Sequence, residues 1–252
     1  MDKNEVLRNL PERVKAHFWS LEQQTGLNIE VVSLPSNCTV ISQYQFIPNP
    51  TNKPIIMLRN DWTPVDVAHE LEHMEMELID GYYVLAWRMP NQQSNPIEET
   101  MSKVRNTTDD EVVHARLVAK GYMLDGEVIK SIRFDVLYPD FIRKINAGRT
   151  QFEDIFYREF VQAELMLKSY SKKLKSKYSI ITNRFIDAFR LQRNAEAQKA
   201  DLVIELFNQY DVQTINGHKA IITGWSQIEE LDRLVGVSYY ERRGSGFILL
   251  WP

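Results

Sequence analysis

Apolar residues recur at helical spacing near the start of this chain. Five of them fall three or four positions apart: Leu7, Leu10, Val14, Phe18 and Leu21. Because a helix turns once every 3.6 residues, this spacing places them on one face. The pattern predicts helix over residues 2–25, with Pro11 marking a restart and Gly26 ending the helix.

Three short runs with strand character follow, at residues 29–34, 39–47 and 54–59. Turn-forming residues separate them, first Pro35-Ser36-Asn37 and then Pro48-Asn49-Pro50. We therefore expect three strands in a small sheet that is mainly antiparallel or mixed.

A second helical pattern begins at Pro64. Thr63 suits the N-cap, Pro64 the first helical position and Asp66 the third, and Asp80-Gly81 ends the pattern. Its apolar positions recur at helical spacing: Val67, Ala68, Leu71, Met74 and Leu78. The stretch therefore predicts an amphipathic helix with a buried face.

The chain turns helical again after residue 97. Thr108-Asp109-Asp110-Glu111 has the form of a capping box, so we expect a new helix to begin at Thr108 and to end near Gly121. Further helices are predicted from Thr150 and over residues 182–210.

The last 40 residues change character. Asn216-Gly217 lies between two apolar runs and predicts a hairpin, Ser226-Gln227-Ile228-Glu229 predicts a short capped helix, and Gly244-Ser245-Gly246 predicts a second hairpin.

Taken together, the predicted helices and strands indicate an α+β fold with two parts. Residues 1–148 form a first domain, and residues 149–252 form a helical region that ends in a small α+β appendage.

Composition narrows the function classes. The 252 residues are 44% hydrophobic and 25% charged with a net charge of −4, which is an ordinary globular profile and argues against nucleic-acid binding. Five lysines within residues 168–177 are the exception, and without a known nucleic-acid-binding motif we interpret them as a solvated helix face and not as a nucleic-acid patch. No signal peptide or membrane-spanning run is expected, so we expect a cytoplasmic protein without membrane contact. Cys38 is the single cysteine, so a metal site must use histidine and carboxylate ligands.

The helix that begins at Pro64 carries His69-Glu70-Leu71-Glu72-His73. Positions four apart share a helix face, so His69 and His73 can supply two corners of a zinc tetrahedron. Glu70 lies about 100° around the helix from His69, where it can take a proton from a zinc-bound water. The alternative interpretation is a solvated acidic helix with two incidental histidines.

A strand, a short turn and a helix with this H-E-x-x-H motif resemble the core of the zincin metallopeptidases, of the gluzincin or aspzincin type. The resemblance covers residues 28–122. It implies a small zincin-like sheet, a Zn²⁺ cofactor and an extended peptide substrate that pairs with the strand before the helix, here residues 55–59.

A catalytic zinc needs a third protein ligand and an open position for water. Asp110 is our first choice, because it shares a helix face with Val113 and His114, and Glu111 is the second. Other candidates remain open: Glu98, Glu99, Asp109 and His114. His114 can instead bind the ligand carboxylate, stabilise the oxyanion of the reaction or lie at the surface as an ordinary helix histidine.

These expectations combine into a zinc metallopeptidase that acts on a peptide or protein substrate, with Glu70 as general base. The rival hypothesis is a zincin-fold interaction or regulatory protein that works through its C-terminal region with little catalysis. Homo-oligomer formation stays open, and the substrate is not specified by the sequence.

Overall fold

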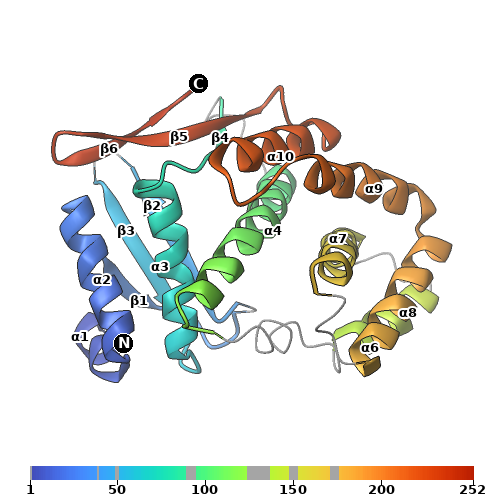
Figure 1. The fold of residues 1–252 in the computed structure, drawn as a ribbon, viewed down its shortest axis with the longest axis horizontal. Coiled ribbons are helices and arrows are strands. Elements are labelled where there is room, and N and C mark those ends of the chain that lie inside the picture. The colour runs from blue at the N-terminus through green and yellow to red at the C-terminus, as the bar shows by residue number, and fades with distance from the viewer. Residues whose placement is uncertain are drawn as a thin grey trace. The chain divides into compact units, whose positions relative to one another are not determined.

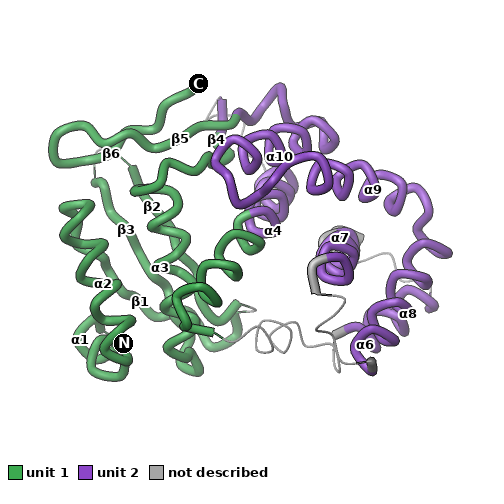
Figure 2. The backbone as a smooth tube through the Cα atoms, in the orientation of Figure 1, with its two compact units in different colours: residues 1–86, 109–123, 237–252 green, residues 87–108, 124–236 purple. Residues whose placement is uncertain are grey.

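The computed structural model describes residues 2–38, 40–48, 51–88, 95–123, 137–147, 153–170 and 176–252. Helices and two small three-stranded sheets make up the described part of the chain, which confirms the expected mixed α+β class (Figure 1). The chain divides into two compact units, and each draws on separate stretches of sequence (Figure 2). The predicted domain boundary at residue 148 falls outside the described residues.

Unit 1 comprises Met1–Ala86, Asp109–Met123 and Val237–Pro252. Its elements are α1 (Lys3–Asn9), α2 (Glu12–Thr25), β1 (Glu30–Ser33), β2 (Ser42–Ile47), β3 (Lys53–Leu58), α3 (Pro64–Leu78), most of β4 (Val84–Trp87), the end of α4 (Asn95–Ala119), most of β5 (Val235–Arg243) and β6 (Gly246–Leu250). The predicted break at Pro11 is confirmed, and Gly26 ends α2 in the left-handed conformation.

The first sheet has the order β1-β3-β2, with β3 parallel to β1 and antiparallel to β2. The three predicted strands and the mixed sheet are therefore confirmed. The expectation that residues 55–59 form a free edge is wrong, because β3 is paired on both sides. Strand β3 directly precedes α3 in the sequence, but in the sheet it lies between β1 and β2. Among the described strands of this sheet, β2 and β1 are the edges.

Helix α3 packs on the sheet through β2 and β3, and α2 packs against α3 (Figure 1). Its predicted start is confirmed: the backbone N–H and the hydroxyl of Thr63 both donate to the Asp66 carboxylate, at 2.6 and 2.7 Å, and Pro64 is the first helical residue. The predicted apolar positions are buried beneath it. The helix is thereby fixed at its first turn and along its inner face.

The predicted C-terminal hairpin is confirmed as β5 and β6, which pair antiparallel across a turn at Gly244. This hairpin belongs to unit 1, although nearly 200 residues separate it from the first sheet. The side-chain oxygen of Asn52 accepts a hydrogen bond from the Phe247 N–H at 2.7 Å. Phe46 of β2 makes edge-to-face contacts with Tyr240 and Phe247.

Helix α4 corrects the predicted helix start at Thr108. The helix is continuous from Asn95 to Ala119, so Thr108 lies inside it. The Thr108 hydroxyl donates to the Val104 carbonyl one turn earlier at 2.8 Å and caps nothing. The predicted end is confirmed, because Gly121 has a φ of +68° and the Tyr122 N–H bonds the Leu117 carbonyl, as in a Schellman motif.

Unit 2 comprises Trp87–Thr108 and Leu124–Gly236. Besides the first part of α4 it contains α6 (Leu137–Asn146), α7 (Glu153–Tyr170), α8 (Ser176–Gln192), α9 (Asn194–Gln209) and α10 (Ile215–Ile228). The predicted hairpin at Asn216-Gly217 is wrong, because these residues form the first turn of α10. Thr214 is the N-cap, and its hydroxyl accepts from the Gly217 N–H at 3.0 Å.

Helix α10 also corrects the predicted cap at Ser226–Glu229, since Ser226 lies near the end of this helix and not at a start.

Among the described residues, none of the helices combines the length and apolar character needed to cross a bilayer. Residues 171–175 of the lysine-rich stretch lie outside the described part of the chain, and Lys168 donates to Asn208 at 2.9 Å.

Candidate metal centre

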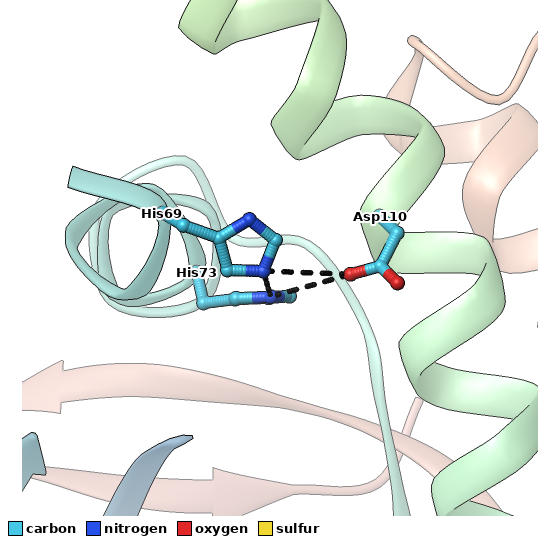
Figure 3. A group of neighbouring side chains, drawn as sticks. All are labelled: His69, His73 and Asp110. Atoms are coloured by element: carbon cyan, nitrogen blue, oxygen red, sulfur yellow. Dashed lines mark hydrogen bonds and ion pairs between the residues drawn. The ribbon is translucent and has the colours of Figure 1, made fainter. Parts of the chain in front are cut away.

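Helix α3 turns His69 and His73 toward the same point. The two residues are one turn apart, and their Nε2 atoms lie 3.1 Å from each other (Figure 3). His73 is buried, and His69 keeps partial exposure. The capped start of α3 and its packing on the sheet hold the backbone from which both rings project.

Asp110 completes the group from α4. Its Oδ1 atom lies 3.5 Å from His69 Nε2 and 3.8 Å from His73 Nε2 (Figure 3). All three potential ligand atoms lie within 4.8 Å of one another. Ligand atoms at 2.0–2.1 Å from a tetrahedral zinc are about 3.4 Å apart, so the three separations bracket the spacing that zinc requires. The residues present therefore fit a zinc ion in both donor type and spacing.

The charge of Asp110 changes the protonation of this group. Burial lowers the pKa of His69, but the hydrogen bond and the negative charge of Asp110 oppose burial and raise that pKa to about 9. Without metal, the cation between these residues at neutral pH is therefore a proton on His69. A divalent ion bound at this position would displace that proton, since ligand histidines must be neutral.

Asp109 lies behind His73. Its Oδ2 atom is 3.8 Å from His73 Nδ1, and the residue is 3% exposed. A carboxylate that accepts a hydrogen bond from the outer nitrogen of a metal-binding histidine fixes its tautomer and ring orientation. At 3.8 Å the Asp109 Oδ2 atom lies beyond hydrogen-bond distance of Nδ1, on the side of His73 where such a carboxylate is found. Sequence analysis included Asp109 only as a candidate ligand. The sequence shows two adjacent carboxylates, Asp109 and Asp110. Only the packing of α4 against α3 shows which of them faces the Nε2 atoms and which lies beside His73 Nδ1.

Glu70 lies beside the metal group, buried against β2. Its Oε1 atom accepts a 2.6 Å hydrogen bond from the Ser42 hydroxyl, and the Tyr44 backbone N–H also bonds its carboxylate. Burial raises the pKa of Glu70, while His69 and Ser42 lower it. A carboxylate with a raised pKa, one residue from the candidate ligand His69, is suited to accept a proton and release it again.

Ser42 is a site residue that sequence analysis missed. Nothing in the residues around it distinguishes it from other strand serines, because its relation to Glu70 arises only when β2 pairs with β3. Ile41 accepts from the Arg59 N–H, so the backbone groups of residues 42, 44 and 46 face away from β3. Ser42 and Tyr44 thus lie at the free side of β2 together with Glu70.

Glu111 and His114 lie near this group without joining it. Burial and the charge of Asp110 raise the pKa of Glu111 to about 7, and Glu111 is not among the three clustered ligands. The His114 ring centroid is 5.6 Å from that of His69, and burial lowers the pKa of His114 to about 4. His114 is therefore neutral at pH 7. Glu98 and Glu99 are exposed at the start of α4, outside the cluster.

A second group of histidine and carboxylate side chains lies between α2 and α3. The polar atoms of His17, Glu72 and Glu75 also lie within 4.8 Å of one another. The sequence around His17 contains no partner at ligand spacing, because its neighbours come from another helix. Its Nε2 atom lies 3.0 Å from Glu75 Oε2.

Comparisons of the chain with protein-family models, with curated proteins and with solved structures find no match.

Proposed function

We propose that this chain is a zinc-dependent metallopeptidase with a zincin-like catalytic unit. The observation that supports it most is the convergence of His69 Nε2, His73 Nε2 and Asp110 Oδ1 beside the buried carboxylate of Glu70. Two imidazoles and one carboxylate leave the fourth zinc position open for water, as catalysis requires. In this proposal Asp110 is the third ligand and Glu111 is not a ligand.

A zinc ion held there supplies Lewis acidity, which polarises the scissile carbonyl and lowers the pKa of water toward about 7. Glu70 takes the proton from the attacking water and passes it to the leaving amine. Ser42 and the Tyr44 N–H orient the Glu70 carboxylate during both transfers. Neutral His114 donates an N–H toward the developing oxyanion.

The peptide substrate binds, in this proposal, along β2 and not along β3. Strand β3 is paired on both sides, whereas β2 is an edge of its described sheet. The backbone groups of Phe46 and the carbonyl of Tyr44 face that edge, and Glu70 lies at the same edge. An extended peptide that adds to β2 therefore passes the candidate metal group.

Replacement of the proposed base tests this function. Glu70→Gln keeps the shape of the side chain and removes the proton acceptor, so hydrolysis of a quenched fluorescent peptide library should fall by about a thousandfold. Zinc measured by elemental analysis should stay at one ion per chain. Activity that survives in Glu70→Gln contradicts the role of Glu70, and wild-type protein that binds zinc without cleaving any peptide favours the interaction-protein hypothesis.

A further inference from the structure

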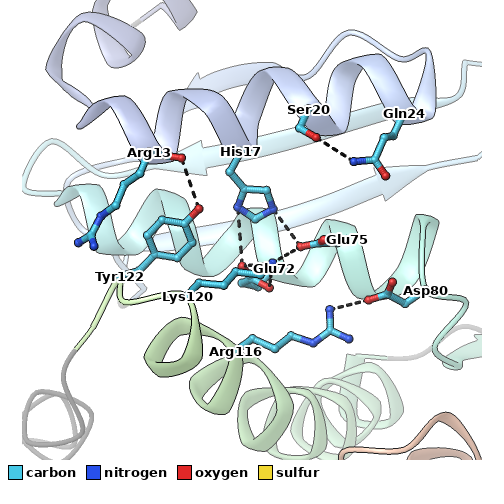
Figure 4. Close-up of polar contacts among 10 residues, drawn as sticks. All are labelled: Arg13, His17, Ser20, Gln24, Glu72, Glu75, Asp80, Arg116, Lys120 and Tyr122. Carbon is cyan, nitrogen blue, oxygen red and sulfur yellow. Dashed lines mark hydrogen bonds and ion pairs between the residues drawn. The ribbon is translucent and has the colours of Figure 1, made fainter.

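The second group on α3 is centred on a lysine. Glu75 follows His73 by two residues and so projects from nearly the opposite side of the helix. Lys120 donates to Glu72 Oε2 at 2.9 Å, lies 2.8 Å from Glu72 Oε1 and also contacts Glu75 (Figure 4). With His17 from α2, these residues form what we call the Lys120 junction: His17, Glu72, Glu75 and Lys120.

This junction contains the residue types of a metal site, but the ammonium group of Lys120 already supplies the positive charge. The ammonium group of Lys120 contacts both carboxylates, and Glu72 is fully buried. Glu75 also contacts Lys120, and its Oε2 atom lies 3.0 Å from His17 Nε2. A divalent ion would have to expel a tethered ammonium from this position. The Lys120 junction is therefore an ion-pair network between helices and not a second zinc site.

Further contacts beside the Lys120 junction also hold the end of α4. Arg13 of α2 donates to the Gly121 carbonyl. The Tyr122 hydroxyl donates to the Arg13 carbonyl at 3.4 Å (Figure 4). One turn earlier, Arg116 donates to Asp80, just after α3, at 2.6 Å. The last turn of α4 is thus attached to both α2 and α3 at several points.

Asp110 depends on this attachment, because it lies on α4 ten residues before Lys120, which directly follows the last helical residue. Ten residues of helix extend about 15 Å, so a tilt of about 5° at the attached end moves Asp110 by about 1.3 Å. Metal–ligand distances tolerate only about 0.2 Å. A small loosening of the end of α4 is therefore enough to carry Asp110 away from His69 and His73.

We propose that Lys120 is a positioning residue for the metal centre: its contacts with Glu72 and Glu75 hold α4 so that Asp110 meets His69 and His73 before metal arrives. The inference rests on the zinc site of the proposed function. It adds that zinc affinity is set in part by a lysine that touches neither the metal ligands nor the substrate.

Zinc affinity of Lys120→Met tests the inference. Zn²⁺ is titrated against a chromophoric chelator with wild-type protein, Lys120→Met and the control Lys3→Met. Lys3 pairs with Glu22 at 2.6 Å in the same unit, so the control also removes a lysine–glutamate ion pair. Lys120→Met should weaken zinc binding by about tenfold, the lower end of the loss seen when a hydrogen-bonded support of a ligand is removed, because Lys120 acts through α4 and not on a ligand. Lys3→Met should bind as wild type does, and Lys120→Arg should restore most of the affinity.

Removing Lys120 leaves two facing carboxylates, so the single variant can fail to fold. The double variant Glu72→Gln with Lys120→Met removes one charge of each sign and keeps a folded protein in the experiment. Its zinc affinity should also fall by about tenfold. Wild-type affinity in a folded Lys120→Met or in the double variant overturns the inference and leaves the proposed function intact. If the wild type binds no zinc, both fail, and if it binds zinc without cleaving peptides, only the function fails.

Discussion

Two groups of histidine and carboxylate side chains share α3, one completed by Asp110 of α4 and the other by His17 of α2, and they differ in the cation that balances them. At the metal centre, His69 carries a proton at neutral pH because Asp110 raises its pKa to about 9. At the Lys120 junction, the cation is an ammonium group attached to the chain. A proton leaves when a metal ion arrives, whereas a tethered ammonium stays.

The comparison teaches that clustering of ligand types does not identify a metal site. Both groups have three ligand atoms within the same distance limit. The two groups differ in whether a metal ion can replace the positive charge that neutralises their carboxylates: a proton on His69 can be replaced, and the ammonium group of Lys120 cannot. The predictions below test this difference, beginning with the largest expected effect.

Loss of the third ligand should have the largest effect. Asp110→Ala removes the carboxylate that meets both imidazoles, so zinc affinity should fall by more than about a hundredfold, beyond the loss caused by a supporting residue. Glu111→Gln is the matched control, and it should keep zinc because Glu111 lies outside the cluster. Chelator competition measures both variants. The reverse result would make Glu111 the ligand.

Zinc affinity should rise with pH at the metal centre. His69 holds a proton up to a pKa of about 9, so each zinc ion bound below that pH releases one proton and affinity rises about tenfold per pH unit. In metal-free protein the same raised pKa stabilises the fold below the ordinary value of 6.5, and this contribution is lost as pH rises through about 9. Titrations at several pH values measure the slope, and a flat profile would exclude proton exchange at His69.

Stability should rank the two groups in the opposite order from metal affinity, with the larger loss at the Lys120 junction. Lys120→Met should lower the free energy of unfolding of the metal-free protein by about 2 kcal/mol, less than a fully buried ion pair because Lys120 is about one-third exposed. His69→Ala, measured at about pH 10 where His69 has lost its proton, should lower it by no more than about 1 kcal/mol. Urea unfolding in the presence of a chelator measures both. Equal losses would remove the distinction between the two groups.

Asp109→Asn should have the smallest of these effects. The change keeps the size of the side chain and removes the charge beside His73 Nδ1, so zinc affinity should fall by about tenfold. Peptide hydrolysis at saturating zinc should stay close to that of the wild type. A loss as large as that of Asp110→Ala would make Asp109 a ligand.

Sequence patterns predicted those parts of the fold that local chemistry decides. Thr63, Pro64 and Asp66 form the helix start they indicate, because a cap involves residues only three positions apart. Gly121 ends α4, and Gly244 turns the last hairpin, because both positions need a positive φ. The spacing of His69 and His73 likewise needed only the helix period.

Two local signals were outweighed by their surroundings. Thr108 has a capping sequence, but α4 already runs through it and its hydroxyl bonds back to Val104. Asn216-Gly217 favours a hairpin, but buried Ile221, Ile222 and Trp225 recur with helical spacing and draw the segment into α10. Gly217 is needed there for another reason: a side chain would collide with the Asp211 carbonyl.

Contacts between distant segments could not be predicted from the sequence. Ser42 reaches Glu70 only because β2 is an edge strand, and His17 meets Glu75 only because α2 packs on α3. The choice of Asp110 over Glu111 depends on how α4 faces α3, which adjacent residues in one helix do not reveal. These are the features that turn a five-residue motif into a candidate centre.

An anomalous-difference map at the zinc edge, from crystals grown with Zn²⁺, tests the central claim most directly. The account predicts one peak per chain, about 2.1 Å from His69 Nε2, His73 Nε2 and Asp110 Oδ1, with no peak beside Lys120. A map without a peak between the two histidines, or with the ion among His17, Glu72 and Glu75, would contradict it.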